Sequence, residues 1–147
     1  MLKGIDLILE YGHILNGKRI GLITSISGVN NQLSSTIEII HKHFNLVALF
    51  APEHGVRGNI DAGGIVDDYI DEITGVPVYS LYKKDSKRLT KEMLDNVDMV
   101  VYDIQDIGCR SYTYISTMGN LMEACQEYGK ELVVLDRPNP LGGEKIE

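Results

Sequence analysis

Residues 99–104, Met-Val-Val-Tyr-Asp-Ile, form a near-continuous run of apolar and β-branched side chains. Such runs are typical of strands that are covered on both faces of a parallel sheet, whereas half-exposed strands alternate polar and apolar residues. Three other runs share this character and lie at 19–24, 46–50 and 131–135. A weaker run at 76–81 carries Pro77, which suits an edge strand or a strand start. We therefore predict a mainly parallel sheet with these runs as its strands.

Helices are predicted in the gaps between the strands. Helical spacing of apolar residues indicates helices at 5–14, 33–44, 89–97 and 115–125. The apolar stripe of the last helix consists of Ile115, Met118, Met122 and Cys125. Ser34 or Ser35 is the expected N-cap of the second helix, Thr90 opens the third, and Gly129 ends the fourth. Strands that alternate with helices indicate right-handed crossovers and a three-layer, doubly wound α/β domain.

Composition limits the class of protein. The chain has 147 residues, 44% of them hydrophobic, which suits one globular domain. Its formal net charge of −7 argues against a nucleic-acid partner. No apolar run is long enough to span a membrane. The N-terminus has no signal-peptide pattern, which fits a cytoplasmic chain or one freed of its leader. Cys109 and Cys125 are expected to be reduced thiols.

Two long segments are less regular. Residues 53–74 are rich in glycine and acidic side chains and are predicted as a long loop. The chain ends directly after a Pro/Gly-rich turn without a closing element, so we expect residues 1–147 to be a single domain and the first part of something longer.

Functional side chains are concentrated in the turns that follow the predicted strands. These turns are residues 24–29, 51–58, 103–110 and 136–143. Ligands of open parallel sheets bind outside the carboxyl ends of the strands, where such turns lie close together. Their convergence on one edge of the domain is the argument from the residues themselves for a binding site.

Glu53 and His54 are the most suggestive pair in these turns. A carboxyl group fixed between Pro52 and a glycine turn is suited to general acid catalysis. The alternative is that Glu53 is an exposed carboxylate that pairs with Arg57. His54 either binds a ligand or ties down the loop.

Asp103 and Asp106, with Gln105 between them, are candidates for a second catalytic carboxylate or for ligands of a hard cation. Aspartates at strand ends also commonly cap the following helix, and this alternative is strongest for Asp106. A metal-dependent hydrolase built on Asp103, Asp106 and His54 is a further hypothesis.

Three arginines and two tyrosines complete the set of candidate binding residues. Arg57, Arg110 and Arg137 lie in three different turns and suit recognition of a carboxylate or phosphate, although salt bridges to nearby aspartates are the alternative. Tyr112 and Tyr114 lie at the start of a predicted helix, where they can stack on a sugar ring or remain half-buried. The chain lacks GxGxxG, GxxxxGK[ST] and GxSxG, so we expect no nucleotide cofactor and no α/β-hydrolase elbow.

Several longer motifs, in one order, resemble the bacterial exo-β-N-acetylmuramidases, a glycoside hydrolase family formerly described as a domain of unknown function. The similar segments are residues 50–58, 61–63, 74–81, 102–108, 112–117 and 134–143. The resemblance implies a Rossmann-like N-terminal domain, followed in full-length members by a smaller C-terminal domain that is absent from this chain. It also implies removal of terminal N-acetylmuramic acid from peptidoglycan fragments, without a cofactor or metal.

The resemblance carries over to particular residues by motif. It implies that Glu53 is the catalytic acid, and Asp103 is the second candidate carboxylate. Residues that line the site are then His54, Asp103, Arg110, Tyr112 and Tyr114. Arg110 is the first choice for the lactyl carboxylate of muramic acid. The competing hypothesis is a non-catalytic domain that binds an anionic sugar or a protein partner through the same edge.

Overall fold

One sheet organises the part of the chain that the computed structural model describes, residues 1–58, 67–81 and 88–142. Its strands are β1 (Arg19–Thr24), β2 (Asn45–Ala51), β3 (Tyr69–Ile70), β4 (Pro77–Ser80), β5 (Met99–Asp103) and β6 (Glu131–Val134). Their order is β3-β4-β2-β1-β5-β6, and all neighbours are parallel except β3 and β4. The prediction of a mainly parallel sheet is confirmed.

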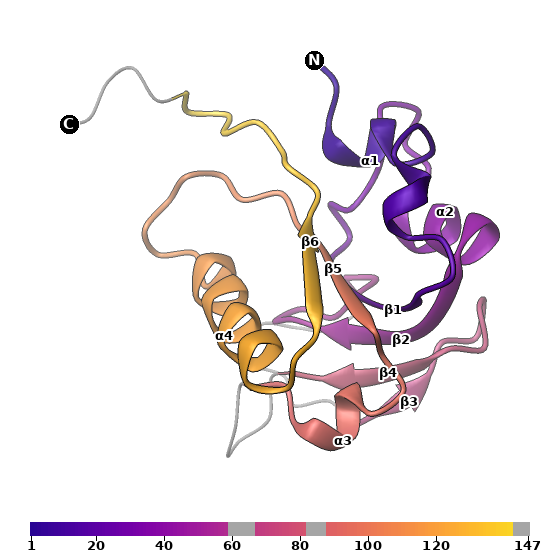
Figure 1. Cartoon of the computed structure of the whole chain (residues 1–147). Helices are drawn as coiled ribbons and strands as arrows, with labels where there is room; N and C mark the ends of the chain where they lie inside the picture. Colours follow the sequence, from indigo (N-terminus) through magenta and orange to yellow (C-terminus); the bar gives the residue numbers. More distant parts are fainter. Residues whose placement is uncertain (59–66, 82–87, 143–147) are drawn as a thin grey trace.

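Helices cover both faces of this sheet (Figure 1). They are α1 (Gly4–Leu7), the 3-10 helix η1 (Gly12–Ile14), α2 (Thr36–His43), α3 (Lys91–Leu94) and α4 (Tyr114–Glu127). One hydrophobic cluster joins α1 and α2 to one face, and a second joins α3 and α4 to the other. This arrangement confirms the three-layer, doubly wound α/β fold.

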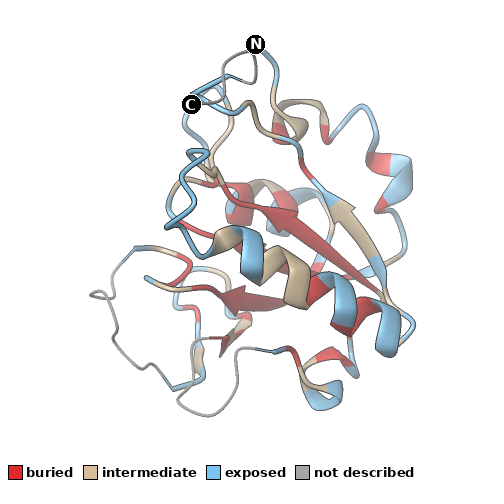
Figure 2. Ribbon diagram, turned by 90° about the vertical axis from the view of Figure 1, so that its left-hand side faces the viewer, coloured by how far each residue is buried: buried red, intermediate tan, exposed pale blue. Residues whose placement is uncertain are grey.

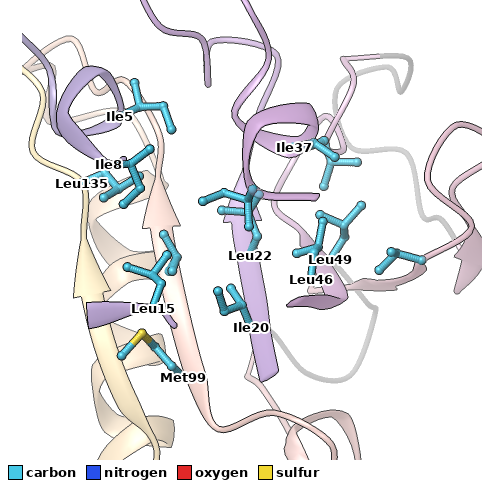
Figure 3. Close-up of a cluster of buried hydrophobic side chains, with 14 of the residues drawn as sticks. Ile5, Ile8, Leu15, Ile20, Leu22, Ile37, Leu46, Leu49, Met99 and Leu135 are labelled. Atoms are coloured by element: carbon cyan, nitrogen blue, oxygen red, sulfur yellow. The ribbon is translucent and has the colours of Figure 1, made fainter. Parts of the chain in front are cut away.

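Alternate residues of the central strands belong to different clusters. In β1, Leu22 packs in the cluster under α1 and α2, whereas its neighbour Ile23 packs in the cluster under α3 and α4. Figure 3 shows the first cluster, in which Leu22 lies near Ile37 of α2. Buried residues are concentrated in the strands (Figure 2). Burial of both faces explains why the runs of the central strands β1, β2 and β5 are continuous. The same expectation is wrong for β6, an edge strand whose four residues are exposed or half-buried.

The N-terminal half of the predicted helix 33–44 differs from expectation. The helix begins at Thr36, and the Ser35 hydroxyl accepts a hydrogen bond from the backbone N–H of Ile37. Ser35 was one of the two expected caps. Leu33 lies outside the helix with a φ of 64° and a side chain that is 80% exposed. The apolar stripe therefore starts at Ile37, because the Ser35 cap fixes the helix start at Thr36, three residues after Leu33.

The predicted apolar stripe of α4 is wrong at two positions. Ile115 and Met122 are 60% and 54% exposed. The buried face consists of Leu121, Ala124 and Cys125. A helix of this length offers two overlapping apolar stripes, and packing against the sheet selects the one that contains Leu121. Gly129 has a φ of 64°, as expected for the residue that ends this helix.

The segment predicted as a loop, 53–74, contains a strand. Tyr69 and Ile70 form β3, which pairs antiparallel with β4. Two residues are too few to show an alternating pattern, so the sequence does not reveal this strand. Residues 59–66 of the same segment, including the motif at 61–63, lie outside the described residues.

A candidate site at the carboxyl edge of the sheet

The turns that follow the strands contact one another, as predicted. The Thr24 hydroxyl at the end of β1 donates to the Asp103 carbonyl oxygen at the end of β5, at 2.8 Å. The turn after β2 reaches the turn after β1, because a Cβ added at Gly58 would lie 2.9 Å from Ile26 Cδ1. The carboxyl edge of the sheet is thus one continuous surface built from distant segments.

Asp103 and Arg137 form a buried ion pair within this edge. Arg137 Nε donates to Asp103 Oδ1 at 2.6 Å, and Arg137 Nη2 donates to Oδ2 at 2.8 Å. The side chains are 0% and 4% exposed. Oδ2 also accepts from the Thr36 hydroxyl, and Arg137 Nη2 donates to the carbonyl oxygen of Val29. The salt bridge that was the alternative for Arg137 is therefore present, and these groups are engaged with one another.

Gln105 and Asp106 also make local contacts. The Gln105 side-chain Nε2 donates to the backbone carbonyl oxygens of Asp106 and Pro138, at 2.7 and 2.9 Å. Asp106 Oδ1 accepts from the backbone N–H of Gly108 at 2.7 Å. Asp106 therefore stabilises the turn after β5 and does not cap α4, whose capping position is Thr113. These contacts join the turns after β5 and β6.

Arg57 pairs with Asp71 and not with Glu53. Its Nε and Nη2 atoms donate to the two carboxylate oxygens of Asp71 at 2.6 and 2.9 Å. Thr74 adds hydrogen bonds from its N–H and hydroxyl. The Arg57 guanidinium is the main cause that lowers the pKa of Asp71 to about 2. Arg57 thus joins the turn after β2 to the turn between β3 and β4, and its role in ligand binding stays a prediction.

Glu53 lies in a surface hollow of about 290 Å³. The residues that line it are Glu53, His54, Ser111, Tyr112, Thr113 and Tyr114. A second hollow, of about 150 Å³, is lined by Pro52, Glu53, Leu81, Thr113, Ser116, Thr117 and Asn120. We call them the tyrosine hollow and the polar hollow. Glu53 and Thr113 line both, so the carboxylate lies on their shared wall.

The backbone after β2 explains the position of Glu53. Pro52 follows the strand directly and supplies no N–H group to continue the ladder. His54 and Gly55 then have φ angles of 72° and 77°, in the left-handed region. A histidine in this region is strained, and such strain is found mainly where the surrounding structure requires it. The turn holds Glu53 half-buried while His54 is exposed.

Tyr112 and Tyr114 form the aromatic part of the tyrosine hollow. Their ring centroids lie 6.1 Å apart, and the planes meet at 63°. Tyr112 is 43% exposed, so its ring is available to a ligand. Burial raises the pKa of Tyr114, and the negative charge of Glu53 raises it further. Tyr114 therefore keeps its phenol proton and remains a hydrogen-bond donor at neutral pH.

Arg110 lines a third cavity, larger than the two hollows beside Glu53. This cavity has a volume of about 440 Å³ and is mostly apolar, with Ile104, Ile115, Met118 and Val134 among its lining residues. Arg110 is not among the residues that line the tyrosine hollow, and its predicted role in ligand binding stays a prediction. Arg110 is exposed and makes no ion pair with any residue that the structure describes.

Other properties bear on the metal, membrane and thiol predictions. Within residues 1–58, 67–81 and 88–142, no three His, Cys, Asp or Glu side chains lie close enough to share a metal ion. Asp103, Asp106 and His54 do not come together as a ligand set. None of the described helices has the length and apolar character needed to cross a bilayer. Cys109 and Cys125 are free, the former exposed and the latter buried.

Comparisons with known proteins identify relatives of this chain. The family model described as "Exo-beta-N-acetylmuramidase NamZ, N-terminal" matches residues 20–147. Peptidoglycan beta-N-acetylmuramidase NamZ of Bacillus subtilis is 57% identical over an alignment 147 residues long, which covers 98% of this chain and 35% of that protein. A crystal structure of a DUF1343 family protein from Bacteroides fragilis is 56% identical, with a TM-score of 0.89, and the match covers 99% of this chain and 36% of that one.

A second Bacteroides fragilis DUF1343 structure is 37% identical, with a TM-score of 0.78, over 95% of this chain and 35% of that one. The chain thus spans about a third of the length of these relatives. The match over most of the chain also confirms the resemblance that the turn motifs indicated. The chain belongs to the family of the exo-β-N-acetylmuramidase NamZ N-terminal domains.

Proposed function

We propose that this chain is the N-terminal part of an exo-β-N-acetylmuramidase, in which Glu53 is the catalytic acid. The position of the Glu53 carboxyl group is the observation that supports this proposal. Glu53 is half-buried at the carboxyl end of β2, on the wall shared by two hollows, with tyrosines on one side. A carboxyl group on the wall between two adjacent hollows is suited to act on a bond that joins two groups bound on either side of it.

The reaction follows from the chemistry of glycosidic bonds. The protonated carboxyl group of Glu53 gives its proton to the bridging oxygen as the C–O bond of the terminal sugar breaks. A water molecule supplies the hydroxyl group on the anomeric carbon, and its remaining proton goes to a second carboxylate or returns to Glu53. In glycosidases the two carboxyl groups lie about 5–5.5 Å apart for retention and about 6.5–9.5 Å apart for inversion.

Asp103 remains a prediction as the second catalytic carboxylate. Both of its oxygens accept hydrogen bonds from Arg137, and its side chain is fully buried. These contacts favour a supporting role, in which Asp103 and Arg137 hold the ends of β5 and β6 in place. Gln105 joins the same turns and belongs to the same support.

The substrate is proposed to be a peptidoglycan fragment that ends in N-acetylmuramic acid, as the name of the Bacillus subtilis relative indicates for that protein. The exposed ring of Tyr112 suits stacking on the apolar face of a sugar. Arg110, exposed beside the larger cavity, is proposed to bind the lactyl carboxylate. The C-terminal domain of full-length members is the proposed partner that brings Arg110 and Glu53 into one cleft.

A non-catalytic domain that binds an anionic sugar or a protein is the second candidate function. The observation in its favour is the 440 Å³ apolar cavity beside Arg110, which Glu53 does not line. This function requires Arg110 and does not require Glu53. The two proposals therefore differ in what a change at each residue does.

The test uses a hybrid in which this chain replaces the matching segment of the Bacillus subtilis relative. The hybrid and its variants are assayed on a chromogenic β-N-acetylmuramide. Glu53→Gln keeps the shape of the side chain and removes the acid, so kcat is expected to fall by a factor of about 100 or more. Glu10→Gln, at an exposed glutamate outside the site, is the matched control and is expected to leave kcat unchanged.

The outcomes separate the two functions. Retained turnover in Glu53→Gln would refute the catalytic proposal. If Arg110→Ala loses binding of N-acetylmuramic acid while wild type and Glu53→Gln bind it equally without turnover, the chain is a binding domain.

A further inference from the structure

Thr113 makes the hydrogen bond that fixes the Glu53 carboxylate. Its hydroxyl donates to Glu53 Oε2 at 3.1 Å, across a separation of 60 residues in the sequence. No other side-chain hydrogen bond to Glu53 is formed by the residues that the structure describes. The contact joins the turn after β2 to the residue before α4, two segments that also line the same hollows.

Thr113 does not perform the usual task of a threonine at this position. Threonine before a helix normally accepts a hydrogen bond from an N–H group of the first turn. Ser35 and Thr90 do so for α2 and α3. Thr113 has φ −87° and ψ −8°, and its side chain makes no such bond. Its hydroxyl is therefore committed to Glu53 and not to the helix.

The position of Thr113 also argues against a packing role. The residue is exposed and belongs to neither hydrophobic cluster. Its side chain lies on the wall between the tyrosine hollow and the polar hollow, as Glu53 does. The one side-chain contact that the structure gives its hydroxyl is thus with the proposed catalytic acid.

We propose that Thr113 is a positioning residue for Glu53, an inference that rests on the proposed function. With Oε2 held by Thr113, Oε1 is the oxygen that carries the proton to the glycosidic bond. As the proton leaves, Glu53 becomes a carboxylate, and a hydrogen bond to an ionised oxygen is stronger than one to a neutral carboxyl group. The Thr113 hydrogen bond therefore strengthens in the transition state and accelerates the chemical step more than it improves substrate binding.

The test compares Thr113→Val with Thr113→Ser in the hybrid enzyme, with a chromogenic β-N-acetylmuramide. Valine has the shape of threonine without the hydroxyl, so kcat is expected to fall about tenfold while KM changes less than twofold. Serine retains the donor and is expected to restore at least half of the wild-type kcat. Equal losses in the two variants, or an unchanged kcat in Thr113→Val, would overturn the proposal.

Thr90→Val is the matched control, because Thr90 caps α3 through an accepted hydrogen bond from the Met93 N–H and lies outside both hollows. This variant is expected to lower the melting temperature and to leave kcat unchanged. Thr113→Val is expected to lower kcat and to leave the melting temperature unchanged. A Thr113→Val variant that loses melting temperature and activity together would show a structural role instead.

A second measurement separates this inference from the proposed function. The carboxyl-carbon chemical shift of Glu53 in the isotopically labelled chain is expected to change in Thr113→Val and to stay near the wild-type value in Thr113→Ser. No change in Thr113→Val would refute the contact itself. If the shift changes as expected but Glu53→Gln keeps full turnover in the hybrid, the positioning contact holds and the catalytic role of Glu53 fails.

Discussion

Replacing Arg137 with methionine should strongly destabilise the domain. The change removes both hydrogen bonds to Asp103, whose side chain is 0% exposed, and leaves the Thr36 hydroxyl as the one described partner of a buried charge. Breaking a buried ion pair in this way costs about 3–5 kcal/mol. The Val29 carbonyl oxygen also loses a donor. We expect a loss of about 4 kcal/mol, a large fraction of the ~5–15 kcal/mol stability of a typical domain.

Urea unfolding of the chain measures this loss. With an m-value of about 2 kcal/mol/M, the midpoint is expected to fall by about 2 M. Asp103→Asn keeps the shape and removes the charge, so the double variant Arg137→Met with Asp103→Asn should recover part of the stability that Arg137→Met loses. The control is Arg19→Met, because Arg19 forms a similar pair with Asp98 at the surface. An exposed pair contributes about 0–1 kcal/mol.

The comparison also tests the assignment of roles at the carboxyl edge. If Arg137→Met costs no more than Arg19→Met, the buried pair is not a structural support. Arg137 would then be free to meet a ligand, as the sequence suggested, and the argument from burial would be refuted.

Two further predictions concern titratable groups. Asp71 has a pKa lowered to about 2, against 3.8 for a free carboxyl group, so its pairing with Arg57 contributes stability above about pH 4 that is lost as the pH falls toward 2. Asp71→Asn should remove about 1–2 kcal/mol of this acid dependence, measured by urea unfolding from pH 2 to 6, and an unchanged slope would contradict it. Burial raises the pKa of Cys125 to about 11, whereas Cys109 is exposed. At pH 8 a thiol reagent should therefore label Cys109 in the folded chain and reach Cys125 only in denaturant; rapid labelling of Cys125 would contradict its burial.

The sequence predicts the central strands best, because burial on both faces gives a continuous apolar run. The run at 19–24 coincides with β1, and the run at 99–104 exceeds β5 by one residue. Every residue between these ends needs an apolar partner on one face or the other, so the signal is continuous. Strand β3 has only two residues, and a feature this short leaves no periodicity.

Helix faces are harder to predict, because the spacing of apolar residues on a helix does not show which of them are buried against the sheet. Ile115 fits the same helical spacing as Met118, yet it is exposed on the cavity beside Arg110. Leu33 fits the stripe of α2, but its positive φ places it in the turn before the cap. The Leu33 error arises because the Ser35 cap sets the helix start, and the Ile115 error arises because packing against the sheet selects the buried stripe.

The candidate site was predictable in its location and only partly in its composition. Convergence of the turns follows from a parallel sheet, and Glu53, His54, Tyr112 and Tyr114 line one hollow as the motifs suggested. The sequence position of an arginine after a strand end is the same whether its side chain binds a ligand or pairs with an aspartate. The contact of Thr113 with Glu53 was not predicted, because a threonine before a helix is normally interpreted as its N-cap. The position of Thr113 between two candidate tyrosines was the available signal.

These contacts divide the carboxyl edge into a structural support and the part that carries the proposed acid. The ion pair of Asp103 and Arg137, with Gln105, locks the turns after β5 and β6 by buried hydrogen bonds. The turn after β5 leads directly to Thr113, so the support sets where the Thr113 hydroxyl lies. Glu53 comes from the opposite side, held by the strained turn after β2. The position of the proposed acid therefore depends on the turn after β2 and on the segment before α4, and the hydrogen bond between Thr113 and Glu53 joins the two.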